Sequence, residues 1–120
     1  MAKRSRRRTE KPAAPTSVYT EVDGNSITLR GALTPASRMK YAQILAGSER
    51  PAATREDAWH RAVEFLFEHL ALRWEIAGAP IERQKELLGR FRAASSSERA
   101  WIRDVLREHC AEHFPDVQAP

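Results

Sequence analysis

The densest group of chemically active side chains lies in the first eleven residues of the chain. Six basic residues there face a single acid, Glu10, which gives this stretch a net charge of +5. The whole chain carries +4, so the remainder sums to −1. Cations at such close spacing displace the counterions that condense on DNA or RNA. We therefore predict that the stretch engages nucleic acid through Lys3, Arg4, Arg6, Arg7, Arg8 and Lys11.

This basic stretch contains no aromatic residue that could stack on bases. It would therefore position a nucleic acid without reading its sequence. Adjacent arginines repel one another, and Pro12 and Pro15 favour an extended backbone, so we expect residues 1–17 to form a disordered basic arm. Similar runs serve as solubility tails or contact acidic proteins, and both alternatives remain open.

A second set of basic residues lies nearer the C-terminal end. Arg99, Arg103 and Arg107 recur every four residues, a spacing that places them on one side of a helix. The helix expected before them and the serine-rich turn have the lengths of a helix-turn-helix, in which these arginines would contact DNA. Acidic residues interleave with them and weaken that interpretation. The three arginines remain candidate nucleic-acid contacts.

His109, Cys110 and His113 are the residues whose types could bind a metal or act as nucleophiles. Two histidines four residues apart can hold a metal from one side of a helix, but Cys110 projects about 100° away from His109. A thiol beside a histidine can be a nucleophile, yet the sequence indicates neither a fixed base nor a cleft. We expect the histidines to interact with the C-terminal end of their helix, and Cys110 to be a small buried residue.

Motifs of catalytic or cofactor-binding chemistry are absent from the sequence. A glycine-rich phosphate loop, a HExxH zinc motif and the GxSxG turn of serine hydrolases are all missing. The acidic residues of the longest expected helix are spaced like an ordinary solvated helix edge. The sequence therefore predicts a protein that is not an enzyme and that uses no cofactor and no metal.

Length and composition place the chain in one small domain. It has 120 residues, of which 42% are apolar, enough for a single buried core. Its single cysteine can form no internal disulfide, and its basic start is not followed by the apolar stretch of a secretory signal. No apolar run is long enough to span a membrane. We expect a cytoplasmic protein without a membrane partner.

The elements that position these residues begin with a predicted β-hairpin. Val18–Val22 and Ile27–Arg30 are rich in β-branched residues and flank a turn that contains Gly24. A lone hairpin is marginally stable, so its inward faces should pack against helices. By alternation, we expect those faces to consist of Val18, Thr20 and Val22 in the first strand and Ile27 and Leu29 in the second.

Two helices are expected directly after the hairpin. Thr34, followed by a proline, has the pattern of a helix start, and Gly47 ends that helix. Thr54 begins a long central helix, because apolar residues spaced by three and four continue from there as far as residue 76. Gly78 and Pro80 end this second helix.

Two further helices complete the expected elements. The third runs from Ile81 to about Ala93. Ser95 and Glu98 have the spacing of a capping box, which predicts the start of a last helix that Phe114 ends.

Together these elements predict an α+β protein that is mainly α. We expect a disordered basic arm over residues 1–17, a single domain over 18–115 and a flexible C-terminus over 116–120. Within the domain, a short β-hairpin precedes a compact four-helix body. The tryptophans and phenylalanines are expected to fill the core, and the alternative is that some of them form a surface for a protein partner.

The order of elements, Val18–Arg30 before Pro35–His113, resembles that of small phage tail-assembly chaperones. Those proteins also place a short strand pair before a compact helical body, and the resemblance implies a structural or assembly role. From the residues themselves we predict a non-enzymatic binding module. Its basic arm would engage DNA or RNA, and its helical body would contact a protein partner or a second copy of the chain.

Overall fold

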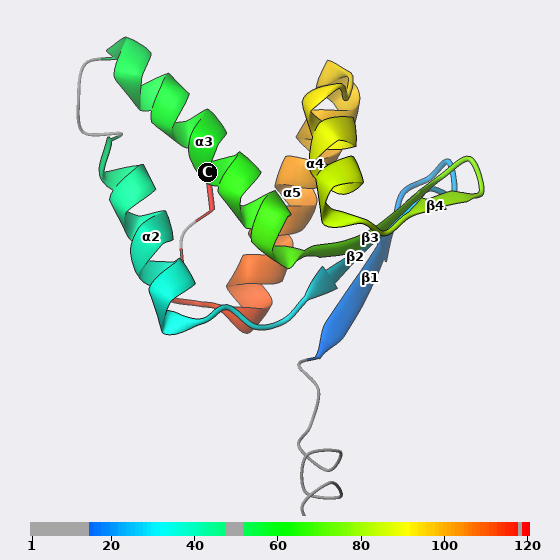
Figure 1. Ribbon diagram of the computed structural model, residues 1–120, viewed down its shortest axis with the longest axis horizontal. Coiled ribbons are helices and arrows are strands. Elements are labelled where there is room, and N and C mark those ends of the chain that lie inside the picture. Colours follow the sequence, from blue (N-terminus) through cyan, green and yellow to red (C-terminus); the bar gives the residue numbers. More distant parts are fainter. Residues whose placement is uncertain (1–14, 48–51, 118) are drawn as a thin grey trace, which may run out of the picture.

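A β-sheet and a set of helices make up the structure, a computed structural model that describes residues 15–47, 52–117 and 119–120 (Figure 1). In these residues the strands are β1 (Thr16–Thr20), β2 (Ser26–Arg30), β3 (Ala71–Ile76) and β4 (Ala79–Ile81). They form one antiparallel sheet in the order β1-β2-β3-β4. The prediction of a helix-rich α+β protein is confirmed. The helices are α2 (Pro35–Ala46), α3 (Ala52–Leu70), α4 (Gln84–Arg92) and α5 (Ser96–His113).

The predicted hairpin is present as β1 and β2, but the opposite face of its first strand turns inward. Ile27 and Leu29 of β2 are fully buried, as expected. Their partners across the ladder are Tyr19 and Ser17, and cross-strand partners share a face of the sheet. The prediction for the first strand is therefore wrong. The residues that were expected inside are exposed, namely Val18, Thr20 and Val22.

Local capping signals mark two helix starts where the sequence predicts them. The Thr34 hydroxyl accepts a hydrogen bond from the backbone N–H of Ser37 at 3.0 Å, and a proline follows Thr34 at the first helical position. Ser95 and Glu98 form a capping box, in which each side chain accepts from the backbone N–H of the other at 3.1 and 2.9 Å. Because these signals act within one turn, they set the residue at which α2 and α5 begin, whatever the rest of the fold.

The long central helix predicted to reach residue 76 ends at Leu70. The chain then enters β3, in which Trp74 pairs with Ile27 of β2 and is buried. Helical spacing of the apolar residues favours a continued helix, but a two-stranded hairpin alone is marginally stable. Pairing of β3 with β2 extends the sheet and buries the indole ring. Similarly, Ile81 does not begin a helix but lies in β4, and α4 begins at Gln84.

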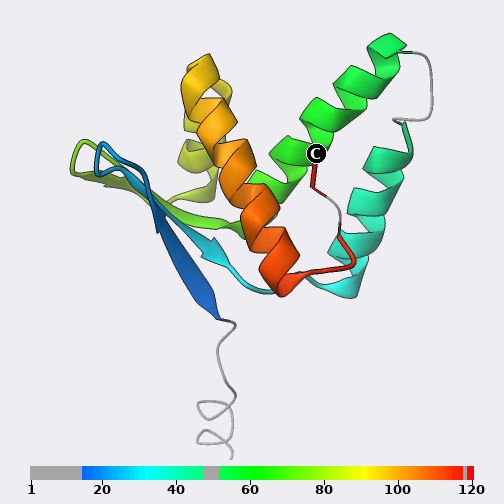
Figure 2. The same cartoon turned by 180° about the vertical axis from the view of Figure 1, so that it is seen from behind.

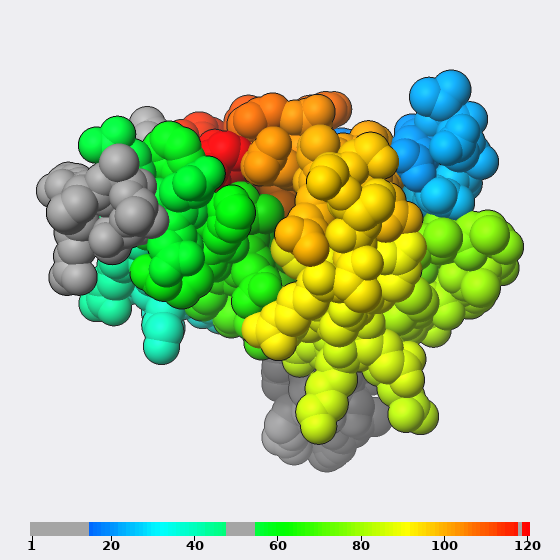
Figure 3. Space-filling model, turned by 90° about the horizontal axis from the view of Figure 1, so that it is seen from above, coloured from blue at the N-terminus to red at the C-terminus, as the bar shows by residue number. Residues whose placement is uncertain are grey.

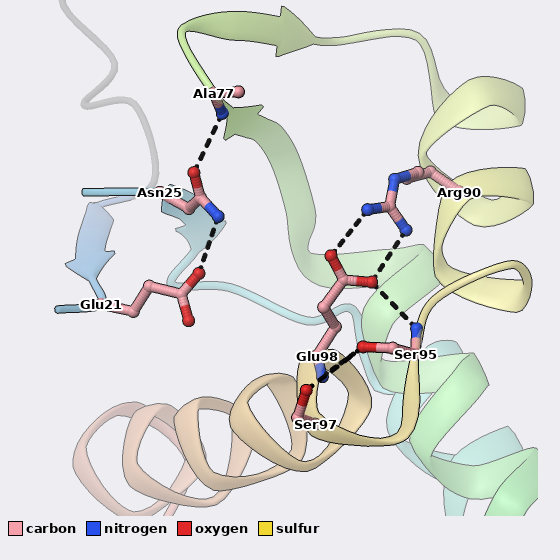
Figure 4. A network of polar contacts seen from close by, with 7 residues as sticks. All are labelled: Glu21, Asn25, Ala77, Arg90, Ser95, Ser97 and Glu98. Carbon is pink, nitrogen blue, oxygen red and sulfur yellow. Dashed lines mark hydrogen bonds and ion pairs between the residues drawn. The ribbon is translucent and has the colours of Figure 1, made fainter. Parts of the chain in front are cut away.

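Ala77 and Gly78 form the tight turn between β3 and β4. Both have positive φ angles, of 51° and 80°. The Ala77 N–H donates to Asn25 Oδ1 at 2.9 Å, and Asn25 Nδ2 donates to Glu21 Oε1 at 2.8 Å (Figure 4). One amide side chain thus joins the tips of both hairpins. The turn is hard to predict from sequence, because residues with a Cβ are uncommon at positive φ.

Replacing Ala77 by asparagine is expected to stabilise the protein by about 0.5–1 kcal/mol. The left-handed conformation costs alanine about 1 kcal/mol, and asparagine tolerates it better. Urea denaturation measures the change in unfolding free energy. Ala79→Asn, at an exposed position of β4, is the matched control and should give no gain. A less stable Ala77→Asn variant would contradict the observed turn.

Phe67 of α3 belongs to the core between the helices and the inward face of the sheet. It is fully buried, its ring stacks on Phe91 of α4 with centroids 4.6 Å apart, and it meets Trp74 of β3 edge-on at 5.7 Å. One side chain therefore joins three elements.

Two large residues from the predicted apolar helix faces are not in the core, since Met39 is 65% exposed and Trp59 is 44% exposed.

The ends of the chain differ in how far they are described. Residues 1–14, with most of the predicted basic arm, lie outside the described residues, and β1 begins at Thr16, within the range expected for the arm. At the other end, the chain returns toward α3, and Val117 and Ala119 are partly buried against the core (Figure 2). Flexibility of residues 116–120 stays a prediction.

Candidate nucleic-acid interface

A groove opens where α3 diverges from the joint between α4 and α5, and we call it the arginine groove. Figure 3 looks onto this side of the molecule, with α3 in green, α4 in yellow and α5 in orange. The groove has a volume of about 440 Å³. Val63, Phe91 and Ala100 form its apolar floor. The polar residues that line it are His60, Glu64, Arg92, Ser96, Arg99 and Arg103.

The joint between α4 and α5 is fixed by Arg90 and Glu98. Their side chains form two hydrogen bonds of 3.1 and 2.7 Å, and Glu98 also accepts from the backbone N–H of Ser95 (Figure 4). The hydrogen bonds from Arg90 and from the Ser95 backbone lower the pKa of the Glu98 carboxyl. The Arg90 guanidinium also lies 5.2 Å from the centre of the Trp74 ring. These contacts hold the end of α4 beside the first turn of α5.

Two arginines of the groove are positioned by contacts within the protein. Arg92 forms a two-bond ion pair with Glu64 of α3, with distances of 3.0 and 2.9 Å. The hydrogen bond from Arg92 lowers the pKa of the Glu64 carboxyl. Arg99 donates from Nη2 to the backbone carbonyl of Arg92 at 3.0 Å. Both guanidinium groups are thus oriented in the free protein, which reduces the entropy that they would lose on binding a ligand.

Positive charge exceeds negative charge along the arginine groove. Three arginines and one carboxylate line it, so the formal excess is +2. Arg103 is exposed, and in the described part of the chain it makes no ion pair or hydrogen bond. A guanidinium can bind two phosphate oxygens through parallel N–H donors. The groove therefore has the charge and the donors to hold a phosphate group.

Two of the acidic residues that interleave with the arginines of α5, Glu108 and Glu112, lie on another side of the helix from the groove. Arg99 and Arg103 face the groove, whereas Glu112 and Glu108 lie close enough to Tyr19 of β1 to contribute, after burial, to its raised pKa. Glu108 and Glu112 follow Arg103 by five and nine positions, which at about 100° per residue places them towards the opposite side of the helix. Glu108 and Glu112 are therefore separated in space from Arg99 and Arg103, so that the side of α5 at the groove is basic while the side towards β1 is acidic.

Arg107 is not brought into the groove with the other two arginines of the predicted set. It forms an ion pair with Asp104, three residues earlier on the exposed surface of α5. An exposed pair of this kind contributes little to stability and partly neutralises the charge of Arg107. A role of Arg107 in nucleic-acid binding stays a prediction.

A buried polar cluster joins β1 and β2 to the C-terminal half of α5. His109 is fully buried, with Nε2 2.8 Å from the carbonyl oxygen of Arg30 and Nδ1 2.9 Å from the Tyr19 hydroxyl. Because a carbonyl only accepts, Nε2 carries the proton and the neutral ring accepts from Tyr19 at Nδ1. His113 Nε2 lies 3.2 Å from the Ser17 hydroxyl. His109 is thus a core residue, contrary to the expected role at the end of the helix.

Stability is expected to fall as the pH is lowered below 6.5, the ordinary pKa of histidine. Burial lowers the pKa of folded His109, so the unfolded chain binds a proton more readily than the folded one. The contribution is fully present above pH 6.5 and is lost as the pH falls towards the folded pKa. Unfolding free energies from urea titrations between pH 8 and 5 measure it. The His109→Gln variant should lose most of this slope, and an unchanged slope would contradict the assignment.

Burial lowers the reactivity of the Cys110 thiol. Cys110 is buried, and burial raises the pKa of its thiol to about 11. The thiol is therefore protonated at neutral pH and is a poor nucleophile. His109, next to it in sequence, uses both ring nitrogens in hydrogen bonds. No set of three or more His, Cys, Asp or Glu side chains that could hold a metal ion occurs among the described residues.

The structure thus brings together Arg99 and Arg103 from the predicted set and adds residues that were not among the predicted nucleic-acid contacts. These are His60 and Glu64 of α3 and Arg92 at the end of α4. Charged residues are common on helix surfaces, so the sequence does not distinguish these three from others. They stand out in the structure only because α3 diverges from the α4–α5 joint and they line the groove between them. The six basic residues predicted in the arm, Lys3, Arg4, Arg6, Arg7, Arg8 and Lys11, lie outside the described residues.

The chain matches no protein-family model, no curated protein and no solved structure. In the described part of the chain, no helix is long and apolar enough to cross a membrane.

Proposed function

We propose that this protein is a non-enzymatic module that binds the phosphate backbone of DNA or RNA. The observation that carries the proposal is the arginine groove, in which Arg92, Arg99 and Arg103 meet from two helices with a formal excess of positive charge. The basic arm adds six further cations in the sequence, Lys3, Arg4, Arg6, Arg7, Arg8 and Lys11. The helical body would in addition contact a protein partner or a second copy, for which the exposed Met39 and Trp59 offer apolar surface.

The chemistry of the groove favours the phosphate backbone over the bases. Besides the imidazole of His60, its only aromatic ring is that of Phe91, which is buried in the floor, so the groove offers no exposed Phe, Tyr or Trp ring on which a base could stack. Arginine side chains contact phosphates of any sequence equally well. We therefore expect binding that depends strongly on salt and weakly on sequence.

The basic arm and the groove would contribute differently to nucleic-acid binding. The cations of the arm would contribute counterion release, whereas oriented arginines on helices would define where the nucleic-acid backbone lies. Glu64 keeps Arg92 in place and limits the charge of the groove, so the affinity of the groove alone should be modest. Binding by the full chain should combine both contributions.

Fluorescence anisotropy with a labelled duplex at several salt concentrations tests this proposal. The full chain should bind with a steep dependence of log K on log salt concentration, with a slope of about 0.9 for each phosphate neutralised. Deletion of residues 2–11 should weaken binding and flatten the slope without abolishing binding. Unchanged affinity after the deletion would exclude a role for the arm, and absence of binding by the full chain at low salt would refute the proposal.

A further inference from the structure

The two edges of the sheet differ in how well they are protected from pairing with another strand. β4 is one edge, and it is short and contains Pro80, which lacks an N–H donor. β1 is the other edge, and its sequence TSVYT contains neither a charged residue nor a proline. Natural sheets usually protect an open edge with such residues. β1 is therefore the edge at which another strand can pair.

The hydrogen-bonding groups that β1 offers can be identified from its pairing with β2. Glu21 N–H donates to Asn25 O at 2.9 Å, and Gly31 N–H donates to Pro15 O at 2.6 Å, so these pairs belong to the bonded set. In an antiparallel ladder every second residue belongs to that set. The alternate residues point their backbone N–H and C=O groups away from β2. They are Thr16, Val18 and Thr20.

β1 is held in place on its inward side before any partner arrives. Tyr19 is hydrogen-bonded to His109 at 2.9 Å, and Ser17 lies 3.2 Å from His113, so two side chains tie the strand to α5. The backbone pairs with β2 along its whole length. Because the strand is already ordered, pairing at its open edge costs little conformational entropy.

We infer that a second copy of this chain occupies the open edge, with its β1 antiparallel to the first. A two-fold axis at Val18 pairs Val18 with its copy and each Thr16 with the Thr20 of the other chain. Such a pairing brings no like charges together, because the strand is uncharged. The sheets of the two copies would then be continuous across the axis.

Charge favours this antiparallel arrangement over a parallel one. The chain enters β1 from the basic stretch that ends at Lys11, and it leaves β1 towards a turn with the acidic residues Glu21 and Asp23. Antiparallel pairing places the entering end of one copy beside the leaving end of the other. Parallel pairing would instead place Glu21 and Asp23 of one copy beside those of the other, where the like charges repel.

Analytical ultracentrifugation of the full chain without nucleic acid tests the inference. The natural protein should show a concentration-dependent dimer. In Val18→Pro, the outward N–H is lost while the bonds to β2 remain, so the dimer dissociation constant should rise at least about tenfold. Far-ultraviolet circular dichroism and thermal unfolding verify that the variant is folded. Val18→Thr, which keeps the outward N–H at the same exposed position, is the matched control and should leave the dimer unchanged.

A charge-pair experiment tests the register. Lysine at both Thr16 and Thr20 places like charges opposite each other and should weaken the dimer, whereas Thr16→Glu with Thr20→Lys places opposite charges together and should preserve it. A purely monomeric natural protein, a dimer that survives Val18→Pro, or equal effects of the two double variants would overturn the inference. Arg99→Glu with Arg103→Glu should remain dimeric, so failure of the dimer and failure of nucleic-acid binding are separate results.

Discussion

A variant with Arg99→Glu and Arg103→Glu is expected to bind duplex DNA at least about tenfold more weakly than the natural chain at moderate salt. Each reversal removes a charge-assisted contact to a phosphate and adds a repulsive carboxylate to the arginine groove. The dependence of log K on log salt concentration should also flatten by about 2, because two phosphates are no longer neutralised. Anisotropy titrations across a salt series measure both quantities.

The control for this variant must change the net charge equally at another place. Lys40→Glu with Lys85→Glu does so, because both lysines are exposed and lie on α2 and α4 outside the groove. It should weaken binding only slightly, through the long-range field that salt screens. Equal losses in the two variants would show that binding follows net charge and not the groove.

Phe67→Ala is expected to lower the unfolding free energy by about 3–5 kcal/mol. The ring is fully buried, stacks on Phe91 and meets Trp74 edge-on, so its removal leaves a cavity at the contact of α3, α4 and β3. Close-packed interiors relax only partly around such a space, so most of the cavity should remain. Urea denaturation followed by circular dichroism measures the loss.

Met39→Ala on α2 is the control for this core variant. Met39 is 65% exposed, so its truncation should change the unfolding free energy by no more than about 0.5 kcal/mol. If Phe67→Ala lowered the unfolding free energy as little as Met39→Ala does, the Phe67 ring could not be a main contact between the three elements.

Features that depend on neighbouring residues could be predicted from the sequence. The helix starts at Thr34 and Ser95 follow from side-chain oxygens that accept backbone N–H groups within one turn. The β1–β2 hairpin follows from two β-branched runs around a glycine-containing turn. None of these signals requires contact with a distant part of the chain.

Features that depend on distant contacts could not be predicted in the same way. The residues of β3 have the spacing of a helix face, and only pairing with β2 favours the strand in which Trp74 is buried. The inward face of β1 is set by the partners of Ile27 and Leu29 across the ladder, which place Tyr19 and Ser17 inside. Tyr19 in turn finds its partner in His109, near the other end of the chain.

The candidate site likewise combines a feature that could be predicted from the sequence with features that depend on distant contacts. The basic side of α5 could be predicted from the spacing of Arg99 and Arg103. Its combination with Arg92 and Glu64 could not, because the pair between those two residues links α4 to α3. The acidic residues of α5 argued against a binding surface in the sequence, and in the structure Glu108 and Glu112 lie towards β1 instead.

The most direct measurement is an NMR titration of the isotope-labelled full chain with a short DNA duplex. We predict that the largest chemical-shift changes in the body occur along the arginine groove, at the amides of Arg92, Arg99 and Arg103 and at His60 of α3. The outer face of the sheet should remain unchanged. Shift changes confined to residues 2–11, or centred on the sheet, would contradict nucleic-acid binding at the groove.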